Sequence, residues 1–394
     1  MRETKVIPSL IELLAELDAQ DVQGYWRFKI INEWLTLKAR QLDLPESGSF
    51  ELTPLCNLDC KMCYVHLNAN QLKTGERLLT VDEWKEIIRQ AVEAGMAYAT
   101  LTGGECLTYP GFQEIYQYLF SLGIVPSVLT NGRLLTEDLI AFFVKYPPAS
   151  LQVTLYGSCE EAYEKVSGHR AFQEVMDGIQ RAKHAGLNLY LAITPSRYMQ
   201  EDAEELLNTV HALNVPYTIS ASTIPARSET GREVKEFSVE VDALSRINEK
   251  EREFFSSLQA AESIKPLPRY IPPDAGKTLW GLPCGGAHSS FHVNWKGELS
   301  PCIAFSDAVH QQILEKGFMT AWNQIQQSMS GYRPPEECTK CESSWRCVTC
   351  PGEKNTGQIQ GKLNPSVCEK IHRRIEDSKK TDEINAKSVY PDCP

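Results

Sequence analysis

The chain has 394 residues and a formal net charge of −11, with 42% hydrophobic and 23% charged residues. These values are typical of a globular protein with two or three domains, and the acidic balance does not favour binding to a nucleic acid. No run approaches the roughly 18 apolar residues of a membrane span, and the amino terminus lacks a secretory h-region. We therefore expect a cytoplasmic protein with no membrane partner, in which ten of the 13 cysteines bind metal and disulfides are absent.

Residues 1–48 are predicted to form a helical extension. A capping-box pattern begins at Ser9, and leucines follow it at helical spacing. A second helix is expected from about Asp21 to Gln41, with Trp26, Ile30 and Trp34 on one side. Such stripes usually pack against the rest of the protein, and binding of a partner is the alternative.

Residues 49–221 alternate short apolar runs with helical patterns. The predicted strands are Phe50–Thr53, Ala97–Thr102, Val125–Thr130, Leu151–Leu155, Leu189–Thr194 and Tyr217–Ser220. Helix start signals at Thr80 and Thr136 separate them. This alternation predicts an α/β fold with a parallel sheet and right-handed crossovers. A full barrel needs about 250 residues, so the segment predicts an open (βα)6 partial TIM-like barrel.

The last part of the chain changes character. Residues 222–276 are predicted to be a helical linker, with a charged helix near Val239–Ala261 and then several prolines. From Cys284 onward the chain is rich in cysteines and turns. Residues 277–394 are therefore predicted to be a second domain held together by metal.

Three closely spaced cysteines, Cys56, Cys60 and Cys63, follow the first predicted strand. Three thiolates can ligate three irons of a [4Fe–4S] cluster, which leaves the fourth iron open. A zinc site is the alternative, although zinc sites usually show two paired dyads. The motif resembles the C-x3-C-x2-C pattern of the radical S-adenosylmethionine (SAM) superfamily. In parallel barrels, active sites lie at this end of the strands.

The resemblance implies a set of SAM contacts. A Gly-Gly-Glu turn follows the second strand, and in the family its backbone binds the amino group of SAM; glycine permits such close approach. Cys106 stands next, where the family usually has proline. The residues that the resemblance assigns to SAM are Met62, which would pack on adenine, and Tyr64, Gly103, Gly104, Glu105, Thr130, Asn131 and Thr154. Tyr156 ends the fourth strand beside Thr154. Each residue alone is more often part of a turn or the core.

The C-terminal cysteines resemble the SPASM domain of the same superfamily, except that the interval before Cys350 is one residue short. The resemblance assigns one auxiliary iron–sulfur cluster to Cys338, Cys341, Cys347 and Cys368, and a second to Cys284, Cys302 and Cys350. His288, solvent or substrate would complete the second. A zinc knuckle of Cys338, Cys341, Cys347 and Cys350 is the alternative. Cys106, Cys159 and Cys393 have no place in these clusters. Free thiols usually pack as small hydrophobic side chains. Cys159 could instead donate hydrogen to a substrate radical.

The resemblance implies an oxidoreductase. One electron from a partner such as flavodoxin or ferredoxin would cleave SAM to methionine and a 5′-deoxyadenosyl radical, which abstracts hydrogen from the substrate. SPASM relatives act mostly on peptides, so we expect a maturase that cross-links, oxidises or epimerises a ribosomally synthesised peptide or small protein. A sulfatase-maturase-like enzyme, a small-molecule dehydrogenase and a non-catalytic zinc-stabilised binding module are the alternatives.

Overall fold

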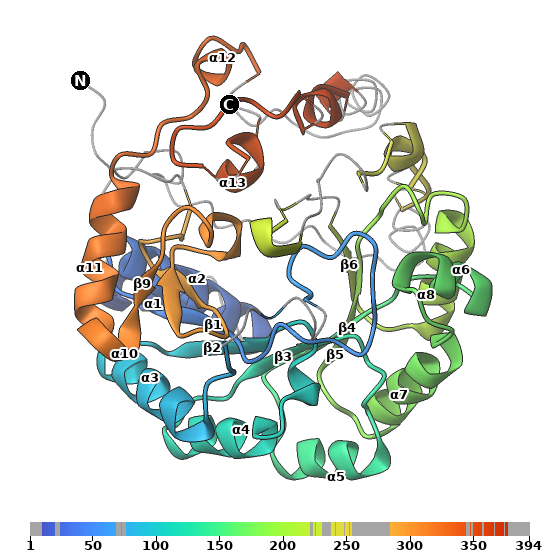
Figure 1. Cartoon of the computed structure of the whole chain (residues 1–394), viewed down its shortest axis with the longest axis horizontal. Coiled ribbons are helices and arrows are strands. Elements are labelled where there is room, and N and C mark those ends of the chain that lie inside the picture. The colour runs from blue at the N-terminus through green and yellow to red at the C-terminus, as the bar shows by residue number, and fades with distance from the viewer. Residues whose placement is uncertain are drawn as a thin grey trace.

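The structure is a computed structural model. It describes residues 10–19, 24–67, 72, 76–220, 224, 226–230, 238–240, 242–247, 249–251, 253, 284–343, 347, 350–356, 358–365, 367–373 and 375–376. Figure 1 shows strands curving around the middle of the molecule, with helices on the outside.

One sheet of nine strands forms the centre of the described part of the chain, in the order β6-β5-β4-β3-β2-β1-β7-β8-β9. The strands are β1 (Ser47–Glu51), β2 (Tyr98–Thr102), β3 (Ser127–Thr130), β4 (Leu151–Thr154), β5 (Leu189–Ile193), β6 (Tyr217–Ile219), β7 (Ser290–Val293), β8 (Glu298–Ser300) and β9 (Gln311–Gln312). Strands β1 to β6 pair in parallel, each with the next along the chain. The predicted open arrangement of six βα units is therefore confirmed.

The labelled helices are α1 (Leu10–Ala19), α2 (Gly24–Gln41), α3 (Val81–Glu93), α4 (Phe112–Ser121), α5 (Glu137–Lys145), α6 (Glu160–Ser167), α7 (Phe172–His184), α8 (Ala203–Leu213), α10 (Ile313–Lys316), α11 (Phe318–Met329), α12 (Glu336–Thr339) and α13 (Pro351–Lys354). Helices α3 to α8 lie between β1 and β6 in the chain and cover the outside of the sheet (Figure 1). Two predicted start signals are confirmed, because Thr80 makes a full capping box and the Thr136 side chain accepts from the Leu139 amide. No described helix is both long and apolar enough to cross a membrane.

The N-terminal helices α1 and α2 share a small hydrophobic core of their own. Leu13, Leu17 and Trp34 are buried in it, and Ile30 packs against it. The Tyr98 hydroxyl donates to Asn32 and so links α2 to β2. The Ser9 capping box and the expected start of the second helix at Asp21 lie outside the described residues.

The sheet continues past the predicted end of the barrel, because β7 pairs in parallel with β1. Strand β1 begins at Ser47, three residues before the predicted start. At Gly48 an added Cβ would lie 2.5 Å from the ring of Phe291 on β7, so only glycine leaves room for this pairing. Part of the predicted charged helix is helical, at residues 242–247 and 249–251. The proline-rich end of the predicted linker lies outside the described residues.

Candidate active site

A cavity of about 350 Å³ opens at the carboxyl ends of the parallel strands. Ten predicted site residues line it: Cys56, Cys60, Cys63, Tyr64, Gly103, Gly104, Glu105, Thr130, Asn131 and Thr154. Tyr156 lines it as well. Met62 instead packs in the main hydrophobic core, so its expected contact with adenine has no support in the structure. The parallel strands thus bring separate sequence motifs to one place.

The cysteine loop is joined to the turn after β2. The Gly104 amide donates to the Thr53 carbonyl at 2.7 Å, and the Glu105 amide donates to the Leu55 carbonyl at 2.9 Å. A Cβ at Gly104 would lie 2.5 Å from the Leu55 carbonyl oxygen, and one at Gly103 would lie 2.5 Å from that of Thr53. The two glycines are therefore required for the close approach of the two loops, in addition to any contact with SAM.

The other side of the cysteine loop is held by the end of α6. The amide of Asp59 donates to the Ser167 carbonyl at 2.9 Å, and the amide of Lys61 donates to the Val166 carbonyl at 3.0 Å. These bonds flank Cys60, which is only 6% exposed. The fold therefore fixes the loop from two directions.

The cysteine sulfurs accept hydrogen bonds from nearby N–H groups. The Leu58 amide lies 3.4 Å from Cys56 Sγ, the His66 amide lies 3.2 Å from Cys63 Sγ, and Asn131 Nδ2 lies 3.6 Å from Cys56 Sγ. Such donors stabilise thiolates and tune iron–sulfur clusters. Burial, followed by the Glu105 carboxylate, raises the pKa of Cys56 to about 12, so a thiolate here requires a bound cation. These residues fit an iron–sulfur cluster.

Glu105 is buried and uses both carboxylate oxygens within the protein. Oε1 accepts from the Thr130 hydroxyl at 2.8 Å, and Oε2 accepts from the Asn131 amide at 2.7 Å. Burial raises the pKa of this carboxyl. Glu105 therefore joins the turn after β2 to the turn after β3, and positions Thr130 and Asn131 at the cavity.

A buried cluster of charged side chains lies beside the cavity, and the sequence analysis missed it. Arg227 donates to both oxygens of Glu51, at 2.7 Å to Oε1, and His292 Nε2 lies 3.3 Å from Glu51 Oε2. Burial alone would raise the pKa of Glu51, but Arg227 and His292 hold it below its ordinary value. The one sequence feature that could have indicated this cluster was Glu51, a carboxylate within the first predicted apolar strand. Its partners lie far along the chain, so no local pattern predicted the cluster.

The C-terminal cysteines divide into two groups. A cavity of about 260 Å³ is lined by Cys338, Cys341, Cys347 and Cys368, the predicted four-cysteine set. His372 also lines it, with Nε2 3.7 Å from Cys341 Sγ. Cys350 is not part of this lining, which does not favour the alternative zinc knuckle.

Cys350 groups instead with Cys284 and Cys302. Burial, then the neighbouring Cys284 and Cys350, raise the pKa of Cys302 to about 12. His288 Nδ1 lies 2.7 Å from Asp43 Oδ1. Within the described ranges, no three His, Cys, Asp or Glu side chains are arranged to hold a single metal ion.

Residues 50–212 match the sequence model of the Radical SAM superfamily. This region is a radical SAM domain. A relative with a similar sequence is the sporulation killing factor maturation protein SkfB of Bacillus subtilis (strain 168), which is 26% identical over 202 residues. The match covers 50% of this chain and 47% of SkfB, so it spans about half the length of that relative.

Solved structures share the fold well beyond the radical SAM domain. Streptococcus suis SuiB bound to its precursor peptide SuiA has a TM-score of 0.65 at 15% identity, over 91% of this chain and 87% of SuiB. The enzyme anSMEcpe, with bound AdoMet and the Cp18Cys peptide, has a TM-score of 0.65 at 14% identity, over 88% of this chain and 100% of anSMEcpe. The predicted fold class is confirmed.

Three cysteines belong to none of the three predicted cluster sets. Cys106 is buried beside the cavity of the radical SAM domain and donates to the Leu129 carbonyl at 3.3 Å. Cys159 is exposed at the start of α6 and does not line that cavity. Cys393 lies outside the described residues. Neither described thiol is placed to meet a substrate radical in that cavity.

Proposed function

We propose that this protein is a radical SAM enzyme that cross-links, oxidises or epimerises a ribosomally synthesised peptide or small protein. One observation carries the proposal: three cysteines, a Gly-Gly-Glu turn and polar strand ends surround one cavity at the carboxyl end of a parallel sheet. A protein that only binds an iron–sulfur cluster needs no more than the cysteine ligands. The additional polar side chains around this cavity suit a cosubstrate bound beside the cluster.

Cys56, Cys60 and Cys63 would hold a [4Fe–4S] cluster with an open iron for SAM. The cluster and SAM, when bound, would supply the radical chemistry that removes hydrogen from an unactivated C–H bond. The protein contributes position and exclusion of water. Thr130 and Thr154, on neighbouring strands, offer hydroxyl groups at the cavity wall.

The C-terminal cysteines support a further part of the proposal. We infer that Cys338, Cys341, Cys347 and Cys368 hold one auxiliary cluster, since they surround one cavity. Cys284, Cys302 and Cys350 would hold another with three thiolates. Ile303 lines the barrel cavity and directly follows Cys302, so this set adjoins the reaction site.

The proposed domain division has four parts. They are a helical extension at residues 1–48, the barrel at 49–221, a linker at 222–276 and the SPASM domain at 277–394.

Three related proteins support a peptide as the substrate. SkfB is named as a maturation protein, and SuiB and anSMEcpe are solved with peptides bound. A flavodoxin or ferredoxin would supply the electron. We place the protein in the cytoplasm, where the ten proposed ligand thiols stay reduced.

Anaerobic reconstitution followed by reaction with SAM and dithionite tests the proposal. Three cubane clusters would give about twelve irons per chain, and 5′-deoxyadenosine should form. Co-expression with neighbouring small reading frames should then yield a peptide that is lighter by two hydrogens after oxidation, or unchanged in mass but altered in stereochemistry after epimerisation. Iron-free protein, or protein that leaves SAM intact, would contradict the proposal.

A further inference from the structure

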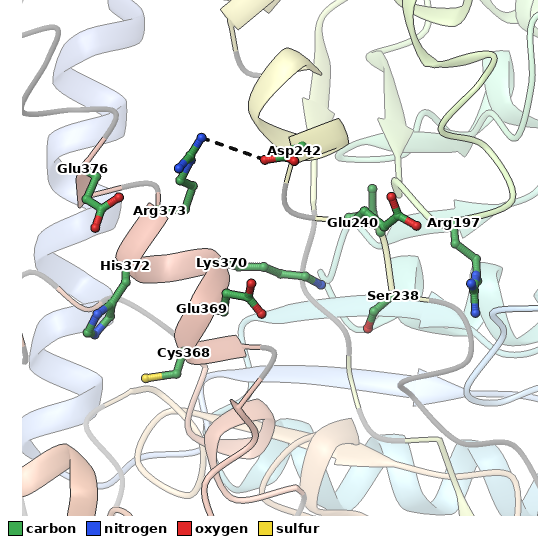
Figure 2. A pocket seen from close by; sticks show the side chains of 11 residues that line it. Arg197, Ser238, Glu240, Asp242, Cys368, Glu369, Lys370, His372, Arg373 and Glu376 are labelled. Carbon is green, nitrogen blue, oxygen red and sulfur yellow. Dashed lines mark ion pairs between the residues drawn. The ribbon is translucent and has the colours of Figure 1, made fainter.

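A second cavity, larger than the one at the barrel strands, lies beside the C-terminal cysteines. Its volume is about 800 Å³, and it is walled by Arg197 after β5, by residues 238–240 and 242, and by the helical residues 368–370, 372, 373 and 376 (Figure 2). An antiparallel bridge between Ser196 and Ser238 joins two of these walls. A cavity of this size holds a ligand as large as a short peptide segment.

Lys370 is the buried charge of this cavity. Its side chain is 9% exposed, and among the described residues its ammonium group has no hydrogen-bond partner. Figure 2 shows the side chain extending from its helix toward Ser238 and Glu240. Burial lowers the pKa of Lys370, and the buried Glu353 carboxylate opposes this in part without a hydrogen bond to the ammonium group. A buried ammonium without an acceptor is costly, so the site is incomplete without a ligand oxygen.

The other charges around the cavity are exposed. The carboxylates of Glu240, Asp242, Glu369 and Glu376 all belong to exposed residues. Arg373 Nη2 lies 3.9 Å from Asp242 Oδ1, so these two charges offset each other. Water and salt screen exposed charges strongly and a buried charge weakly. The strongest electrostatic contact available to a ligand is therefore with Lys370.

The cavity shares a wall with the four-cysteine cavity. Cys368 and His372 line both. In Figure 2 the Cys368 sulfur points away from Lys370, so this helix presents its cysteine and its lysine in different directions. A ligand held at Lys370 would consequently lie next to the proposed auxiliary cluster.

We propose that this cavity binds an acidic segment of the substrate peptide, with a glutamate or aspartate carboxylate of that segment accepting hydrogen bonds from Lys370. The proposal rests on the peptide-modifying function proposed above and adds a residue that selects the substrate. It predicts that substrates carry a carboxylate outside the residues that react.

The test uses the full chain, reconstituted anaerobically, and a fluorescein-labelled glycine heptapeptide that contains two glutamates. Fluorescence anisotropy should show binding that weakens about tenfold or more in Lys370→Met, as expected when a hydrogen bond to a charged group is lost. Lys370→Arg should retain most of the affinity. The matched control Lys145→Met, on the distant and exposed end of α5, should bind as the wild type does. A probe with glutamine in place of glutamate should bind wild type as poorly as the acidic probe binds Lys370→Met.

Labelling of the wild-type protein provides a measurement that does not depend on any variant folding. Reaction of Lys370 with an N-hydroxysuccinimide ester should slow when the acidic probe is present, whereas reaction of Lys145 should not change. Absence of probe binding, equal binding of both probes, or unchanged labelling of Lys370 would overturn the proposal. Formation of 5′-deoxyadenosine without peptide is measured on the same protein, so failure of this site is distinguished from failure of the radical SAM function.

Discussion

The two cysteine-bearing regions of the molecule are held in place by different means. Around Cys60, the loop is bonded by its backbone to the turn after β2 and to the end of α6. The C-terminal cysteines lie instead mostly in turns and irregular segments, with Cys338 on the four-residue helix α12 and Cys368 on the short helical segment 367–373. Helices this short have little stability of their own. The sheet therefore shapes the first site, whereas the proposed auxiliary clusters would hold the second together.

The largest effect should come from Cys60→Ala. Loss of one of three ligands should release the cluster at the barrel, lower the iron content by about four per chain, and reduce 5′-deoxyadenosine formation to background. Iron analysis and chromatography measure both. Cys159→Ala, which removes an exposed thiol outside the cavity, serves as the control and should leave the iron content unchanged. Full turnover by Cys60→Ala would contradict the proposed role of the cysteine loop in binding the cluster.

Removal of metal should separate the two regions directly. After anaerobic chelation, amide hydrogen exchange should accelerate across residues 338–371, because their fold depends on ligation. Exchange in β2, β3 and β4 should change little, since the parallel sheet and its hydrophobic core remain. Mass spectrometry of peptic fragments measures both. Equal acceleration in the two regions would show that the sheet also needs metal.

The next largest effect concerns the buried ion pair between Glu51 on β1 and Arg227. Arg227→Met leaves the Glu51 carboxylate buried without its cation, which should lower the free energy of unfolding by about 3–5 kcal/mol. Urea denaturation measures the change. The control is Arg77→Met, which removes an exposed ion pair with Glu83 and should have little effect. A small effect at Arg227 would mean that water reaches Glu51.

Gly104→Ala should have a smaller effect, confined to the first region. The new methyl group would meet the carbonyl oxygens of Pro54 and Leu55, and the strain should cost about 1–3 kcal/mol. The affinity for SAM should fall as well, because the cysteine loop must move. Calorimetric titration with SAM and urea denaturation measure the two effects. At Gly331 an added Cβ has ordinary contacts, so Gly331→Ala is the matched control.

Local sequence pattern predicted the strands β2 to β6 well and the start of β1 poorly. The alternation of apolar runs and capped helices identified β2 to β6, and the predicted start of β4 at Leu151 is confirmed. The start of β1 was missed because Ser47 and Gly48 resemble turn residues. They form a strand through pairing with β2 on one side and with β7, far along the chain, on the other. Propensity carries no information about such a distant partner.

The candidate site shows the same division. The resemblance to the SPASM domain assigned the two C-terminal groups, and the four cysteines of the first group line one cavity. Glu105 was predicted at the site, but its bonds to Thr130 and Asn131 depend on the packing of two turns. The Glu51 cluster combines three distant segments. Contacts between such distant segments are set by tertiary structure and have no characteristic spacing in the sequence.

The pairing of β7 with β1 has a practical consequence for protein production. A chain cut before Cys284 would leave the backbone groups of Ser47–Phe50 without the strand that they bond. An uncovered, flat strand recruits other chains by the same hydrogen bonds and causes aggregation. A barrel expressed without these strands is therefore expected to aggregate. Expression trials should retain β7 to β9 even when only SAM binding is studied.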